Sequence, residues 1–188
     1  KSVLPGRPPE REHTNTLDPD RKLRIGYVSP DFRRHAVAYF SEALLTLHDR
    51  NEFELYGFAH LEHKAADAYT ERFKACFDHW FEIAEMSNDE LEKSIRENQI
   101  DILIVLAGHT SNNSLRVFLR KPAPLQASYL FGAGQTTGLP EVDFLISDTE
   151  IVPPEHDYFV AEKVVRLPFS GLPYKPPHDY LEPTPLPF

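Results

Sequence analysis

Cysteine, basic side chains and long apolar runs are all scarce in this chain. It has one cysteine, Cys76, so an intrachain disulfide and a thiolate metal cluster are excluded. We interpret this cysteine as a buried small side chain. The longest strictly apolar run, from Ile102 to Ala107, is much too short to cross a membrane, and residues 1–20 contain no apolar signal region. These absences favour a soluble, cytoplasmic protein without a membrane partner.

Positive charge is also in deficit, with 29 acidic against 20 basic residues and a formal net charge of −9. Such a surface repels the phosphates of nucleic acids, so no nucleic-acid partner is expected. Lys22, Arg24, Arg33 and Arg34 form a small basic cluster along the sequence. We interpret it as a solvated face, with a diphosphate-facing role as the alternative.

The two ends of the chain differ in composition from its middle. Residues 1–21 are polar and rich in proline, which predicts a linker, and residues 178–188 are predicted to be a proline-rich tail or second linker. The sequence begins without methionine. We therefore expect residues 22–177 to form one folded domain of a longer protein.

Strand-like and helix-like segments alternate within this domain. Predicted strands cover residues 24–28, 53–59, 79–83, 100–106, 125–131, 142–146 and 163–167. Predicted helices cover residues 37–47, 65–77 and 114–120, and another begins at the capping box formed by Ser87 and Glu90. The order predicts an α/β domain, a Rossmann-like, doubly wound and mostly parallel sheet with helices on both faces. Segment 100–106 lacks polar alternation and should be a central, buried strand.

Ligands of such domains bind beyond the carboxyl ends of the strands. This rule selects three segments: "SPDFRRH" at 29–35, "AGHTSNN" at 107–113 and "FGAGQTTG" at 131–138. We expect all three to face one crevice.

The first segment has two interpretations. Ser29 and Asp31 are both suitable helix N-caps. His35 follows Asp31 by four residues, so on a helical turn the carboxylate could orient the imidazole as a catalytic base is oriented. The alternative is that Asp31 caps the helix and His35 is a partly exposed helix residue.

The other two segments have similar alternatives. Gly108 permits a tight turn that exposes His109 and Thr110, or else Thr110 caps the following helix. The third segment, with Thr136 and Thr137, suits an anion or a sugar hydroxyl, although it is neither a P-loop nor a complete dinucleotide fingerprint. A flexible turn is the alternative there. The nearby pair His60 and His63 lacks a convincing third ligand, so it is interpreted as a solvated loop and no metal site is predicted.

Three stretches together resemble the O-linked N-acetylglucosamine transferase family, notably its bacterial members linked to tetratricopeptide repeats. They read "LRIGYVSPDFRRHAVAYF", "LAGHTSNNSLRVFLRKPAPLQASYL" and "TTGLPEVDFLISD", and the resemblance runs from about residue 22 to 177. It implies the N-terminal, acceptor-side half of a GT-B fold. It also implies an inverting, metal-independent transfer of N-acetylglucosamine from UDP-GlcNAc to serine or threonine of a protein acceptor, without a cofactor.

The resemblance also assigns roles to single residues. His35 matches the histidine of a D-F-x-x-H motif proposed as the catalytic base, and His109 with Thr110 matches a G-H-T loop lining the same cleft. The candidate catalytic residues are therefore His35 and His109. The candidate substrate-binding residues are Asp31, Thr110, Thr136 and Thr137. The C-terminal catalytic half and upstream tetratricopeptide repeats have no counterpart here, so the resemblance implies that the chain alone is inactive.

Two departures from the family pattern leave an alternative open. Val105 stands four residues before His109, where bacterial relatives commonly have aspartate. The loop usually written W-L-G-Y-P-G-T-T-G reads "YLFGAGQTTG" here, without the proline. Both favour a second hypothesis, in which the domain keeps the glycosyltransferase fold but only binds a protein or a sugar.

Overall fold

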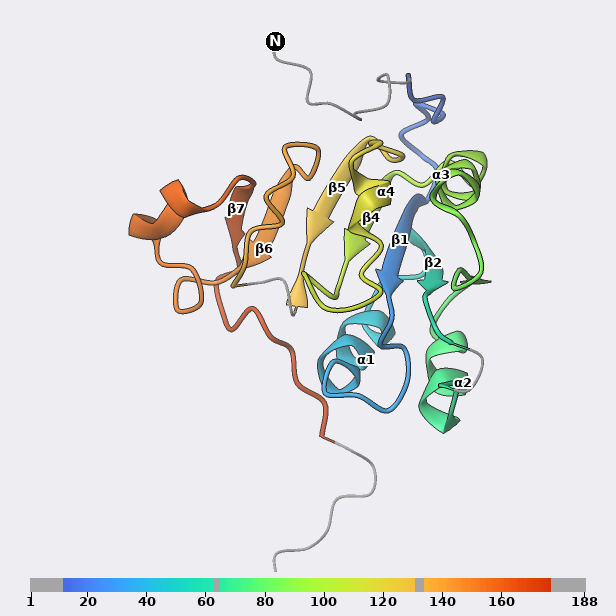
Figure 1. The fold of residues 1–188 in the computed structure, drawn as a ribbon, viewed down its shortest axis with the longest axis horizontal. Helices are drawn as coiled ribbons and strands as arrows, with labels where there is room; N and C mark the ends of the chain where they lie inside the picture. The colour runs from blue at the N-terminus through green and yellow to red at the C-terminus, as the bar shows by residue number, and fades with distance from the viewer. Residues whose placement is uncertain (1–11, 63–64, 131–133, 177–188) are drawn as a thin grey trace, which may run out of the picture.

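One seven-stranded parallel sheet organises the chain in the computed structural model, which describes residues 12–62, 65–130 and 134–176 (Figure 1). The strand order is β3-β2-β1-β4-β5-β6-β7 and every pairing is parallel. The strands are β1 (Leu23–Ser29), β2 (Phe53–Ala59), β3 (His79–Glu82), β4 (Ile102–Val105), β5 (Leu125–Ser128), β6 (Phe144–Ser147) and β7 (Lys163–Arg166). The predicted strands are thus confirmed, and β4 is the central one.

Helices cover both faces of the sheet, as predicted. They are α1 (Ala38–Thr46), α2 (Ala68–Lys74), α3 (Asn88–Glu97), α4 (Leu115–Phe118) and the 3₁₀ helix η2 (Pro154–Phe159). On one face, Leu45 of α1 and Phe73 of α2 join a core that includes Tyr27. On the other, Ile95 of α3 and Phe118 of α4 join a second core. The sheet is therefore the middle of three layers, as in a doubly wound domain.

Two helices are shorter than their patterns predict. Asp67 accepts hydrogen bonds from the amides of Tyr69 and Thr70, and this capping box starts α2 at Ala68 rather than at residue 65. The predicted helix 114–120 is a single turn, because Ser114 has a left-handed backbone (φ 58°) and provides no side-chain cap. Cys76, interpreted as buried, is only half-buried, and its thiol donates to the Arg72 carbonyl oxygen.

The later strands are joined with little helix. The connection from β5 to β6 contains no α-helix in its described part, and only the 3₁₀ helix η2 lies between β6 and β7. Consequently an apolar hollow of about 380 Å³ opens over β4 to β7 on the α1 face.

Across the described ranges, no helix is long and apolar enough to span a membrane. The predicted linker lies partly, and the tail 178–188 wholly, outside the described residues.

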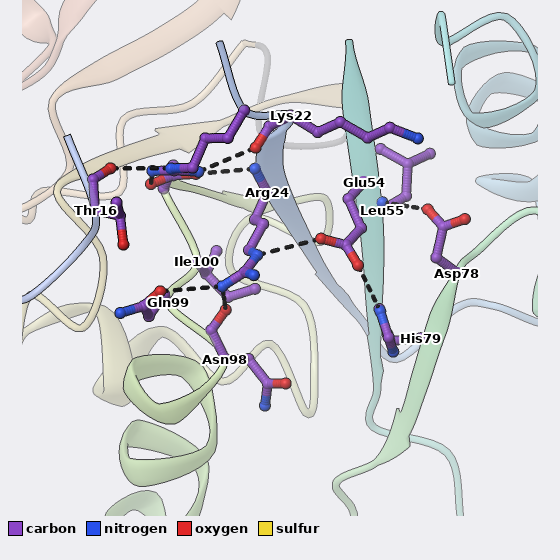
Figure 2. A network of polar contacts seen from close by, with 12 residues as sticks. Thr16, Lys22, Arg24, Glu54, Leu55, Asp78, His79, Asn98, Gln99 and Ile100 are labelled. Atoms are coloured by element: carbon purple, nitrogen blue, oxygen red, sulfur yellow. Dashed lines mark hydrogen bonds and ion pairs between the residues drawn. The ribbon is translucent and has the colours of Figure 1, made fainter. Parts of the chain in front are cut away.

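The four basic residues that are close in sequence do not form one patch. Lys22 and Arg24 lie at the start of β1, whereas Arg33 and Arg34 follow its carboxyl end, so a strand about 20 Å long separates them. Arg24 instead belongs to a polar network at the amino edge of the sheet, where it donates to Glu54, which also contacts His79 (Figure 2). The expected basic cluster was therefore wrong, because an extended strand places residues that are close in sequence at opposite edges of the sheet.

Asp101 anchors the start of β1 at the same edge. Its carboxylate accepts two hydrogen bonds from Arg21, one from the Arg24 amide and one from Asn15. Burial alone would raise the pKa of this carboxyl group, but the Arg21, Arg24 and Asn15 donors hold it below its ordinary value.

We predict that Asp101→Asn lowers the free energy of unfolding at pH 7 by roughly 2 kcal/mol, because a charged acceptor of several hydrogen bonds is lost. A carboxyl group with a depressed folded-state pKa stabilises the fold above its unfolded pKa and loses that contribution as pH falls through the folded value. The difference in the free energy of unfolding between wild type and Asp101→Asn should therefore become smaller below about pH 4. Urea unfolding at pH 7 and below about pH 4 measures this difference.

Glu97→Gln is the matched control, since Glu97 forms an exposed pair with Lys93 at 3.7 Å. It should change the free energy of unfolding by less than about 0.5 kcal/mol. Equal effects of the two substitutions would show that Asp101 does not anchor β1.

Candidate functional site

Two adjoining polar hollows lie at the carboxyl edge of the sheet. The first hollow has a volume of about 450 Å³ and is lined by Asp31, Arg33 and His35 among others. The second hollow, of about 620 Å³, is lined by His109 and Arg116 among others. They share His60, Thr110, Ser111 and Asn112. The first two of the three predicted segments therefore line these two compartments, with the loop after β4 between them, whereas the described part of the third segment, 134–138, lines neither.

Asp31 does not cap α1. The N-cap of this helix is Val37, which makes no side-chain cap hydrogen bond, so the interpretation of Asp31 or Ser29 as the cap was wrong. Ser29 instead accepts a hydrogen bond from the Asp31 amide at 3.0 Å, in a turn that precedes the helix. The buried Asp31 carboxylate lies 3.6 Å from both His35 Nδ1 and Arg33 Nη2. It is placed to orient the imidazole electrostatically.

The His35 ring has two possible partners at Nδ1. The Val37 amide donates to Nδ1 at 3.3 Å, and an amide can only donate, so this contact leaves the proton of the neutral ring on Nε2. Asp31 Oδ1, at 3.6 Å from the same nitrogen, favours the opposite tautomer with the proton on Nδ1. The structure thus brings Asp31 and His35 together at the first hollow, and their predicted roles stay predictions.

The loop after β4 turns as its glycine predicts. Gly108 has a left-handed backbone with φ of 53°, where a side chain would be strained. Thr110 does not cap α4, since its hydroxyl donates to the Ala107 carbonyl oxygen at 2.9 Å. Both His109 and Thr110 are exposed at the hollows. Thr110 lines both hollows and His109 lines the second, so the two candidate histidines belong to neighbouring compartments.

Thr136 and Thr137 line neither hollow. Their hydroxyl groups donate to the buried Glu162 carboxylate, and the Thr137 amide donates to it at 2.6 Å. The Gly138 amide donates to Thr136 Oγ1, so both amides have partners inside the protein. Thr136 still reaches the site through its carbonyl oxygen, which accepts a hydrogen bond from His109 Nε2 at 2.8 Å. Residues 131–133 of this segment lie outside the described residues.

His60 is a site residue that the sequence interpretation missed. It directly follows β2, its imidazole contacts Ser114 Oγ at 3.1 Å, and it lines both hollows. His63, its expected neighbour in a solvated loop, lies outside the described residues. The rule that selected the other three segments also selects the end of β2, so applying it there would have found His60. Among the described residues, no three histidine, cysteine or acidic side chains lie close enough to hold a metal ion.

Val105, the departure noted above, is the last residue of β4 and is fully buried in the core beneath α3 and α4. A carboxylate at this position would start from an apolar environment and would need its own hydrogen-bond partners. The valine is therefore consistent with a purely structural end of the strand.

Comparison with known proteins identifies the family. The model of glycosyl transferase family 41 matches residues 3–171, which is most of the chain. The chain belongs to glycosyl transferase family 41. A family relative from Arabidopsis thaliana, the probable UDP-N-acetylglucosamine–peptide N-acetylglucosaminyltransferase SPINDLY, is 40% identical over 86% of this chain. A second from the same plant, named SEC, is 33% identical over 79% of the chain.

The solved structure of an O-GlcNAc transferase agrees with the fold. A mutant of the O-GlcNAc transferase of Thermobaculum terrenum superposes on 86% of this chain with a TM-score of 0.80 and 40% identity. The match confirms the expected GT-B-type Rossmann-like unit. The chain spans 18% of the length of the SPINDLY relative and 31% of the solved transferase.

We predict that His60 titrates below its ordinary pKa of 6.5, because burial disfavours the imidazolium form while the Glu62 carboxylate only partly offsets this. Glu62→Gln should lower the midpoint further, since it removes the negative charge. The measurement is a pH series of imidazole proton–carbon NMR spectra, with His60 assigned by its loss in His60→Gln. A midpoint at or above 6.5, or a rise in Glu62→Gln, would contradict this.

Proposed function

We propose that the chain is the acceptor-side half of an inverting, metal-independent glycosyltransferase that moves N-acetylglucosamine from UDP-GlcNAc to serine or threonine hydroxyls of proteins. The observation that carries the proposal is the match to the Thermobaculum terrenum O-GlcNAc transferase across 86% of the chain, with the polar hollows at the ligand-binding edge of the fold. Tetratricopeptide repeats upstream, a second Rossmann-like half downstream and a cytoplasmic location belong to the same proposal.

The proposed chemistry is a single displacement. The acceptor hydroxyl oxygen attacks the anomeric carbon from the face opposite UDP and forms a new C–O bond. The bond between the anomeric carbon and the diphosphate oxygen breaks, and its electron pair leaves with UDP. The hydroxyl proton passes to an imidazole nitrogen of His35, because an imidazole can accept and release a proton near neutral pH. For Nε2 to accept it, the ring must carry its other proton on Nδ1, the tautomer that Asp31 favours.

The leaving UDP needs positive charge or hydrogen-bond donors. The amides of Thr137 and Gly138 already donate to Glu162 and Thr136, so these donors are used inside the protein. Among the described residues that line the first hollow, Arg33 is the one arginine or lysine. We therefore assign most of the diphosphate binding to the part of the protein that this chain does not contain.

We predict that His35→Ala in the intact protein lowers kcat by about 10²- to 10⁴-fold, the usual contribution of a general base. UDP affinity should stay nearly unchanged, because the uridine and diphosphate are held elsewhere. Radiolabelled sugar transfer to a protein acceptor and UDP calorimetry measure the two quantities.

His156→Ala is the matched control, since His156 is exposed on η2 and lines neither hollow. It should leave both quantities unchanged. Transfer at the normal rate in His35→Ala would make His35 structural. An intact wild-type protein that binds a protein or sugar but transfers none would favour the alternative, a non-catalytic binding domain.

The 188-residue chain alone is expected to show no transfer and at best weak UDP binding, because the donor-binding half is absent. Calorimetry of UDP into the purified chain tests this. A micromolar dissociation constant would overturn the proposed division of labour between the two halves.

A further inference from the structure

Glu162 is a buried carboxylate in the turn before β7, outside both hollows and 5% exposed. One oxygen, Oε1, accepts hydrogen bonds from the amide and the hydroxyl of Thr137. The other, Oε2, accepts from the Thr136 hydroxyl at 2.6 Å. Within the described residues Glu162 forms no ion pair, so these hydrogen bonds are what stabilise its negative charge.

The Thr136 hydroxyl is fully used in this arrangement. Its oxygen donates to Glu162 and accepts from the amides of Ala161 and Gly138, at 3.1 and 3.0 Å. A hydroxyl group offers one donor and two acceptor positions, so all three are occupied. The carboxylate therefore fixes the backbone of the 136–138 segment in both position and orientation.

This fixed backbone contacts the candidate site at one point. The Thr136 carbonyl oxygen lies 2.8 Å from His109 Nε2. A carbonyl oxygen cannot donate, so Nε2 must carry a proton in the neutral and in the charged ring. Nδ1 is then the only nitrogen of His109 that can accept a proton or a hydrogen bond from a substrate.

We propose that Glu162 is a positioning residue, which acts through Thr136 and Thr137 to hold the His109 ring at the second hollow with its Nε2 protonated. The inference rests on the proposed function, because it gives His109 a place in substrate handling. It extends that function to a carboxylate that lines neither hollow and touches neither substrate nor reacting atoms.

Glu162→Gln is a sharp probe of this arrangement, because it preserves shape but replaces one acceptor oxygen by an NH₂ group. In one orientation this group faces the Thr136 hydroxyl, whose two acceptor positions are filled. In the other orientation it faces the Thr137 amide, a donor against a donor. Either way the Thr136 segment must shift.

Asp148→Asn is the matched control. Asp148 is 4% exposed and likewise accepts from backbone amides, those of Glu150, Ile151 and Gly171. None of these partners contacts His109. Each substitution therefore removes the charge of one buried carboxylate that accepts backbone hydrogen bonds, and only Glu162 is connected to the site.

A double-mutant cycle in the intact protein separates positioning from general destabilisation. We expect Glu162→Gln to lower kcat/KM for transfer by about 10- to 100-fold, and to have little further effect once His109→Ala is present. The fold reductions in kcat/KM caused by Asp148→Asn and His109→Ala should instead multiply in the double variant. Thr136→Ser, which keeps the hydroxyl, should retain activity, and Thr136→Val should not. Effects of Glu162→Gln that multiply with those of His109→Ala would overturn the positioning role.

A second measurement keeps the test independent of activity. Nitrogen NMR of histidine-labelled protein, with His109 assigned by its loss in His109→Ala, should show the Nε2–H tautomer in the wild type and in Asp148→Asn, and a mixture in Glu162→Gln. An unchanged tautomer in Glu162→Gln would overturn the inference. Full transfer activity in His109→Ala would instead refute the role proposed for His109, while the tautomer still decides whether Glu162 positions it.

Discussion

Parallel pairing of β1 between β2 and β4 is the constraint on which the site depends. Ser29 pairs with Ala59, and Val28 pairs with Val105, so the three strands end at nearly the same level. The pairing continues past the strand ends, where the His60 amide donates to the Ser29 carbonyl oxygen and the Leu106 amide to that of Val28. A shift of one residue in either ladder would turn the following side chains to the opposite face. The hollows exist because this register holds.

Hydrogen bonds of charged side chains stabilise this register at the amino edge of the sheet. Asp101 lies in the turn before β4 and accepts from the amide of Arg24 in β1, while Arg24 reaches across to Glu54 of β2 (Figure 2). These contacts connect β1, β2 and β4 at their amino ends, opposite the hollows. The polar groups that fix the strands thus lie at the amino edge of the sheet, apart from those at the carboxyl edge. The polar groups at the carboxyl edge are therefore left to contact a ligand.

The sequence allowed the local features to be predicted, because their physical cause lies within a few residues. The apolar segment 100–106 indicated the central strand, and Ser87 with Glu90 indicated the start of α3. The role of Glu162 could not be predicted, since 25 residues separate it from Thr137 and no local pattern connects them. Asp31 was misread for the opposite reason. Its type and spacing suit a cap, but the chain makes an extra turn before α1 begins.

The two candidate histidines differ in what holds the ring rather than in residue type. Val37 and Asp31 compete for His35 Nδ1, because the Val37 amide donates a hydrogen bond to this nitrogen whereas the Asp31 carboxylate favours a proton on it, so the ring can change tautomer with a small movement. His109 has a carbonyl oxygen at Nε2, which allows only one tautomer. A general base must have its acceptor nitrogen unprotonated when the substrate arrives, so a partner that holds the proton of the other ring nitrogen prepares the imidazole for that task. The contacts therefore set His109 with Nδ1 as its acceptor nitrogen, whereas the acceptor nitrogen of His35 depends on whether the Val37 amide or the Asp31 carboxylate occupies Nδ1.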